Sequence, residues 1–156
     1  MKQTNLVALL ALLAFASCNP SAKEGDEAKT ESKTEKTATT TNTTTAKGVY
    51  FVNLKEGDQV KSPVIIQMGV NGMEVEAAGN MNEGKGHHHI IIDGTFEPKG
   101  TMVPKDETHL HFGQGQIVDT LPLSPGKHTL TLQFANGMHE SYGEEWSKTI
   151  AINVTK

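Results

Sequence analysis

The sequence predicts an all-β fold, an antiparallel immunoglobulin-like β-sandwich, in the part of the chain from residue 47 to residue 156. Short runs in which apolar and polar side chains alternate recur along this part, as in strands with one buried face. Residues that favour turns, chiefly Gly, Pro and Asn, separate these runs. No stretch shows a sustained helical period that begins with a capping residue. Short strands at regular spacing are typical of a sandwich of two antiparallel sheets.

The expected strands follow one another in order along this domain. They cover residues 49–54, 64–70, 87–93, 109–113, 127–134 and 150–154. Pro63 precedes the second strand, at a position that tolerates proline. Side chains two apart on a strand share a face, so alternation assigns an inward-facing set to three strands. The inward sets are Val64, Ile66, Met68 and Val70; Leu130, Leu132 and Phe134; and Ile150, Ile152 and Val154.

The first 46 residues differ in composition and divide into two segments. Residues 1–17 resemble a signal peptide, with a positive charge at Lys2 and an apolar stretch too short to span a bilayer. The following Cys18 completes a resemblance to a bacterial lipobox, although Phe15 stands where leucine is usual, and we expect lipidation of Cys18. The alternative is plain cleavage that leaves Cys18 as a free thiol. Residues 19–46 contain no aromatic residue and no Val, Ile, Leu or Met, so we expect 18–46 to be a disordered linker.

The composition also narrows the location and the partners of the chain. A lipidated signal sequence predicts a lipoprotein of the bacterial cell envelope, attached to a membrane by N-terminal acyl chains, with the domain facing the periplasm or the exterior. Eighteen acidic residues outnumber fourteen basic ones, all of them Lys, which speaks against nucleic acid as a partner. A protein partner in the envelope stays open. Cys18 is the only cysteine, so the folded part has neither a disulfide nor a thiolate ligand.

The most informative feature of the chain is the clustering of its histidines. Five of the seven histidines lie between residues 87 and 111, in two runs of extended character. On a strand, His87 shares a face with His89, and His109 shares a face with His111. If the two strands are neighbours, four imidazoles converge, and neutral imidazole is the commonest ligand for zinc and copper. The sequence therefore predicts a metal site at His87, His89, His109 and His111.

Further residues are candidates for additional ligands or for groups that orient a ligand ring: His88, Asp93, Glu107, His128, Met138 and His139. His88 has the parity of the inward residues, so we expect it half-buried with its ring bonded to backbone. His128 shares the parity of Leu130, which favours a core or rim position over a ligand role. Asp93 or Glu107 would orient a ring through a hydrogen bond.

Methionines near the histidine runs, or in turns, favour copper slightly over zinc. They are Met73, Met81, Met102 and Met138. A thioether beside imidazoles is a donor set that suits copper.

The position of His139 stays open in the sequence. It lies in a turn that either folds back over the site or is solvated.

Three histidine-bearing blocks stand out: Gly86-His87-His88-His89-Ile90-Ile91-Ile92-Asp93, His109-Leu110-His111-Phe112-Gly113 and Pro125-Gly126-Lys127-His128-Thr129-Leu130. Through these blocks, the chain resembles the family called domain of unknown function 4399, and the resemblance covers nearly all of its folded part. The resemblance implies a small exported β-domain without an established activity. Similar domains tend to carry a second histidine and a Pro-rich loop after the strand at 127–134, whereas this chain has Met138-His139-Glu140-Ser141. If that loop supplies a ligand, His139 alone must do so.

Two other functions are weighed against metal binding. In the first, the domain is a structural or interaction module whose histidines only brace loops through hydrogen bonds. In the second, a three-histidine site with an open position activates water as an enzyme would. The sequence carries no nucleophile elbow, phosphate-binding glycine loop, zinc-protease helix or Ser-His-Asp motif, so we predict that the protein is not an enzyme.

Overall fold

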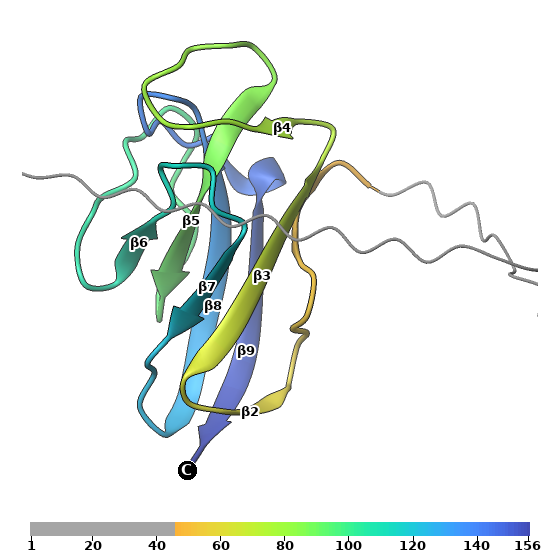
Figure 1. Ribbon diagram of the computed structural model, residues 1–156, viewed down its shortest axis with the longest axis vertical. Coiled ribbons are helices and arrows are strands. Elements are labelled where there is room, and N and C mark those ends of the chain that lie inside the picture. Colours follow the sequence, from red (N-terminus) through yellow and green to blue (C-terminus); the bar gives the residue numbers. More distant parts are fainter. Residues whose placement is uncertain (1–45) are drawn as a thin grey trace, which may run out of the picture. The chain divides into compact units, whose positions relative to one another are not determined.

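The computed structural model describes residues 46–156, which form two β-sheets packed as a sandwich (Figure 1). The small sheet has the order β1-β3-β7, and the large sheet has the order β2-β9-β8-β5-β4, with β6 also paired to β5. The strands are β1 (Gly48–Phe51), β2 (Gln59–Lys61), β3 (Val64–Asn71), β4 (Glu74–Val75), β5 (Lys85–Ile92), β6 (His109–His111), β7 (Val118–Leu121), β8 (Gly126–Ala135) and β9 (Ser147–Thr155). The predicted all-β sandwich is confirmed.

The long strand pairs are antiparallel, as predicted, whereas two short pairs at the edges of the large sheet, β2 with β9 and β4 with β5, are parallel. Helical structure within 46–156 is limited to the single turn η1 (Glu144–Trp146). None of the helices in this range is long and apolar enough to span a membrane. The predicted signal peptide (1–17), the lipidation site Cys18 and nearly all of the predicted linker lie outside the described residues.

Apolar side chains from both sheets fill the space between them. The side chains of Ile66, Leu130, Leu132 and Phe134 have no exposed surface, and the remaining members of the predicted inward sets, apart from the partly buried Val70, are at most 3% exposed. Full burial of a large aliphatic or aromatic side chain stabilises a fold by about 1.5–3 kcal/mol. The alternation of apolar residues along β3, β8 and β9 therefore predicted the core correctly.

Strand β5 differs from the others because both of its faces are buried. His88 and Ile90 face the core between the sheets, as their pairing opposite Phe134 and Leu132 requires. The opposite face, with His87 and His89, is also buried, although such a face is usually exposed in a sandwich. Something other than a sheet must therefore cover it.

A layer of loops covers this outer face of the large sheet. Residues 101–103 and 139–141 pair through backbone hydrogen bonds, in which Val103 N donates to the His139 carbonyl (2.9 Å) and Ser141 N donates to the Thr101 carbonyl (2.8 Å). The buried Gln133 side chain of β8 holds the backbone beside these two segments, since it accepts a bond from Glu97 N before the first (3.1 Å) and donates one to the Gly143 carbonyl after the second (3.2 Å). The histidines of β5 thus lie between a sheet and these loops.

His128 lies on the rim of the sandwich and fastens the end of β5 to the start of β8. Its Nδ1 donates to the Asp93 carboxylate (2.9 Å), its Nε2 donates to the Ser124 carbonyl (2.9 Å), and Asp93 also accepts a bond from Thr129 N (2.9 Å). Burial alone would lower the pKa of His128, but the hydrogen bonds to Asp93 and Ser124 raise it above its ordinary value. The prediction that Asp93 orients a metal ligand is therefore wrong, because Asp93 orients this structural ring.

His88 lies fully buried in the core, with its ring edge-on to Phe134 at a centroid distance of 5.0 Å. Neither ring nitrogen has a hydrogen-bond partner among the described residues, so the expectation that the ring is half-buried and bonded to backbone is wrong. Burial, with a smaller contribution from His87, lowers the pKa of His88 to about 4. The ring is therefore neutral in the folded protein at pH 7.

We expect His88→Leu to flatten the pH dependence of stability in the metal-free protein. Because the folded pKa of His88 lies below the unfolded value of 6.5, the unfolded chain binds more protons between pH 6.5 and pH 4. The contribution of His88 to the free energy of unfolding is complete above pH 6.5. It decreases as the pH is lowered from 6.5 to 4, by at most about 1.4 kcal/mol per pH unit.

Denaturant unfolding of both proteins at several pH values, with a chelator present, measures the difference. Leucine leaves no buried polar atom without a partner, so at pH 7 the variant should equal the wild type or exceed it in stability. An unchanged slope below pH 6.5, or a loss of more than about 1 kcal/mol at pH 7, would contradict this account of the core.

Candidate metal centre

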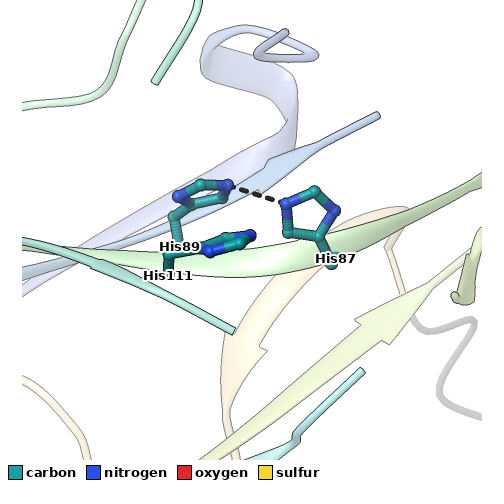
Figure 2. A group of neighbouring side chains, drawn as sticks. All are labelled: His87, His89 and His111. Atoms are coloured by element: carbon teal, nitrogen blue, oxygen red, sulfur yellow. Dashed lines mark hydrogen bonds between the residues drawn. The ribbon is translucent and has the colours of Figure 1, made fainter. Parts of the chain in front are cut away.

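Three of the predicted rings meet on the covered face of β5. The register of β5 and β6 places His89 directly opposite His111, and His87 follows two residues along the same face. The candidate ligand atoms of these three histidines all lie within 4.8 Å of one another, and Figure 2 shows their rings gathered beside the strand. The predicted adjacency of the two histidine runs is confirmed.

A fourth ring comes from the turn after β8. His139 Nε2 lies 3.0 Å from His111 Nε2, and the centroid of its ring lies 5.0 Å from that of His87 and 5.9 Å from that of His89. His139 has a φ of 67°, an uncommon value for a residue other than glycine, and its carbonyl is tied to Val103. We call His87, His89, His111 and His139 the imidazole cluster. The turn therefore folds back over the site, which the sequence left open.

His109 does not join the imidazole cluster, and the prediction that it does is wrong. It lies opposite Ile91, so it is displaced along the strand by two residues, or roughly 7 Å, from the pair formed by His89 and His111. Its Nδ1 donates to the Asp106 carboxylate (2.8 Å), and its Nε2 lies 3.9 Å from Glu97 Oε1. His109 is thus held by carboxylates rather than by other imidazoles.

Sequence reasoning missed Asp106 and Glu97 as the partners of His109. Asp106 Oδ1 also accepts the backbone N–H groups of Thr108 (2.8 Å) and His109 (2.9 Å), which is an Asx-type turn. The bond from the His109 ring is the main reason that the pKa of Asp106 is lowered. The sequence signal for the Asp106 partner was an acidic residue three positions before the histidine. Glu107, which the sequence analysis expected to orient a ring, has an exposed side chain.

Burial disfavours the charged form of three rings in the cluster, those of His87, His89 and His111. His87 and His89 are 0% and 1% exposed, and burial, followed by repulsion from the other imidazoles, lowers the pKa of His87 to about 4 and that of His89 to about 2. The pKa of His111 is lowered by the same causes, with a further contribution from Lys105. Neutral imidazole is the form that ligates a metal, so protons compete weakly for these nitrogens at pH 7.

The buried nitrogens of the cluster lack partners outside it. The Nε2 atoms of His87 and His89 lie 3.0 Å apart, while the Nδ1 atom of each has no hydrogen-bond partner among the described residues. In a neutral pair joined through Nε2, the ring that accepts the hydrogen bond must carry its single N–H proton on a buried Nδ1 that donates to nothing. Such groups are rare in folded proteins, and an ion or a water is one of the partners that can satisfy them.

The spacing of the rings fits a transition metal. A zinc–nitrogen bond is about 2.0–2.1 Å long, so two nitrogens on one tetrahedral ion lie about 3.4 Å apart. The 3.0 Å separation of the His87 and His89 nitrogens is close to this value, and the upper separation of 4.8 Å in the group requires the rings to close by about 1.4 Å.

Gly113 makes room for the ring of His111. A Cβ atom on Gly113 would overlap the Cε1 and Nε2 atoms of His111, so any other residue would displace this ring. A Cβ on Gly137 would likewise overlap the backbone of Asn80, and Gly79 N donates to the Gly137 carbonyl (2.8 Å). Glycine at these two positions therefore allows His111 and the turn that carries His139 to take their places.

A cavity of about 410 Å³ opens beside the cluster. Its lining consists of His89, Met102, Val103, Pro104, Lys105, His111 and His139. His87 is absent from this lining and is completely buried. An ion could therefore approach three of the rings from the side of the loops.

The other candidate residues take no part in the cluster. His88 points into the core on the opposite face of β5, and Met138 is 52% exposed. Asp93, His128 and Ser124 lie in the order of a catalytic triad, with Ser124 Oγ 3.4 Å from His128 Nε2. However, that nitrogen already donates to the Ser124 carbonyl at 2.9 Å, so it is not free to accept a proton from the hydroxyl.

The comparisons with known proteins agree with the signature seen in the sequence. A family model described as "Domain of unknown function (DUF4399)" matches residues 66–155, which include all seven histidines and more than half of the chain. Searches of the curated proteins and of the solved structures found no match. The chain is a member of this family of unknown function.

Proposed function

We propose that the domain binds a transition-metal ion, copper or zinc, through His87, His89 and His111. One observation carries this proposal: the ligand atoms of three imidazoles, two of them completely buried, lie within 4.8 Å of one another. His139 is the natural fourth ligand because its Nε2 lies 3.0 Å from that of His111. A donor set made of imidazoles is one that zinc and copper prefer.

The physical cost of this arrangement supports a binding role. Burying several polar rings without hydrogen-bond partners destabilises a domain, by about 1–3 kcal/mol for each unpaired group. Here the two Nδ1 atoms of His87 and His89 are unpaired among the described residues. A bound ion offsets this cost, because it binds only the folded state and so stabilises it by mass action.

We propose a binding role rather than a catalytic one. The only Ser-His-Asp grouping in the described residues is closed by the bond from His128 to the Ser124 carbonyl, which favours a structural role for it. The cavity beside the cluster gives an ion a path of entry and leaves room for a further ligand. Copper or zinc held there would serve storage, sensing or delivery at the cell envelope.

The location of the protein is part of the proposal. The apolar stretch after Lys2 and the residues before Cys18 support export and acylation of Cys18, which would tether the domain to a membrane of the bacterial envelope. The linker of residues 18–46 would separate the domain from the bilayer and leave it free to meet an envelope protein.

A structural role has specific support for two other histidines. His109 is held by Asp106 and His128 by Asp93, and each pair connects a loop to a strand. For these residues the alternative function, a non-catalytic module braced by histidine hydrogen bonds, is the better interpretation. The imidazole cluster has no such carboxylate partner among the described residues.

We expect His87→Ala with His111→Ala to abolish tight metal binding, whereas His109→Ala leaves it unchanged. Loss of two of three ligands should weaken zinc or copper by more than about 100-fold, or roughly 2.7 kcal/mol. Isothermal titration calorimetry, with zinc or copper added to each purified variant, measures the metal affinity. Equal affinity in the double variant and the wild type would eliminate the metal centre, and an equally large loss in His109→Ala would place the centre elsewhere.

We expect Gly113→Ala to weaken metal binding without removing any donor atom. The new Cβ displaces the His111 ring, and misplacing one ligand should lower the affinity by about 10–100-fold, as loss of a supporting group does. The same titration measures the loss, and circular dichroism controls for folding. A folded variant with wild-type affinity would exclude His111 as a ligand.

We expect Cys18→Ser to release the protein from the membrane fraction of cells. Without a cysteine there is no thiol to acylate, and several acyl chains are needed for firm attachment. Fractionation followed by mass spectrometry of the N-terminus tests this. An unmodified Cys18 in the wild type would contradict the lipoprotein assignment.

A further inference from the structure

The cavity beside the imidazole cluster contains one sulfur donor. Met102 lines it together with His89, His111 and His139, although the Met102 side chain is 63% exposed. Methionine is usually a buried, gap-filling residue, and here the packing of the core does not account for it.

The backbone holds Met102 beside the fourth ring of the cluster. Met102 forms an antiparallel bridge with Glu140, and the adjacent Val103 N donates to the His139 carbonyl (2.9 Å). Met102 and His139 therefore belong to one hydrogen-bonded unit. The thioether is carried to the cavity by the same pairing that carries the His139 ring, rather than by a free loop.

No side chain that lines this cavity carries a carboxylate. The available donors are imidazole nitrogen, the thioether of Met102 and the amine of Lys105. The nearby carboxylate of Asp106 is bound to His109, and that of Glu97 faces the same ring. Magnesium and calcium prefer oxygen ligands, so this donor set does not suit them, whereas thioether and imidazole together suit copper.

The charge of the site distinguishes between the softer ions. The free energy needed to move an ion from water into the protein rises with the square of its charge. It is therefore about four times larger for a divalent ion than for a monovalent ion of the same size. Neutral ligands leave this charge uncompensated, and Lys105 at the cavity adds a further positive charge. A soft, monovalent ion therefore fits these surroundings better than zinc(II) does.

We propose that the ion bound by this centre is copper(I) and that Met102 supplies a thioether ligand to it. The proposal deepens the proposed function and rests on it, since the same imidazoles hold the ion. His87, His89 and His111 provide nitrogen from the sheet, and Met102 closes the site from the loop layer. No redox step is involved, because the ion enters and stays as copper(I).

The test compares copper(I) and zinc(II) affinities of the full chain, purified in detergent, with those of Met102→Leu. Competition with a chromophoric copper(I) chelator under anaerobic conditions gives the first affinity, and competition with a zinc chelator gives the second. Met138→Leu is the matched control, because Met138 is also an exposed methionine (52%, against 63% for Met102) and lies in the turn of His139 without lining the cavity.

We expect Met102→Leu to weaken copper(I) by about 10–100-fold and to leave zinc(II) unchanged, while Met138→Leu alters neither. X-ray absorption at the copper edge should show a sulfur neighbour in the wild type and in Met138→Leu, and none in Met102→Leu. Wild-type copper(I) affinity in Met102→Leu, or a copper spectrum without sulfur, overturns the role of Met102.

The outcomes of this experiment distinguish failure of the copper(I) assignment from failure of the metal centre itself. Tighter binding of zinc(II) than of copper(I) by the wild type would overturn the assignment of the ion and leave a zinc centre of the same histidines. A wild-type protein that binds neither ion would overturn both proposals. Binding that persists in the His87→Ala and His111→Ala double variant would do the same.

Discussion

Everything at this site depends on the burial of the outer face of β5. Backbone hydrogen bonds between residues 101–103 and 139–141 hold a layer of loops over that face, and Gln133 fastens the layer to β8. The layer removes His87 and His89 from water and brings His139 against His111. It also leaves the cavity in which Met102 lies. Without it, the same strand would present solvated histidines with ordinary pKa values.

The histidines of this domain differ in function because their neighbours differ. Where a carboxylate faces the ring, as at His109 and His128, hydrogen bonds fix the ring and it connects a loop to a strand. Where other imidazoles and buried surface face the ring, as at His87 and His89, the charged form is disfavoured and neutral nitrogens remain available. His88 is a third case, since it packs against Phe134 in the core. The electrostatic surroundings, rather than the residue type, separate a ligand from a brace.

The sequence was sufficient for the fold and for three of the four rings of the cluster. Alternation placed Leu130, Leu132 and Phe134 inward, and the same parity put His87 and His89 on one face. Parity gives the face of a residue but not its position along a neighbouring strand, so it grouped His109 with His111 although the register displaces His109 to Ile91. His139 reaches the cluster only through loop pairing, which has no periodic pattern. Likewise, burial on both faces of β5 depends on loops that alternation does not describe.

The most direct test of the account is the position of a bound ion. Crystals of the protein grown with copper or zinc, measured at the absorption edge of the metal, would give an anomalous peak at each ordered ion. The account predicts one strong peak about 2.0–2.1 Å from nitrogens of His87, His89 and His111. A peak between His109 and Glu97, or no peak beside these three rings at full metal loading, would contradict it.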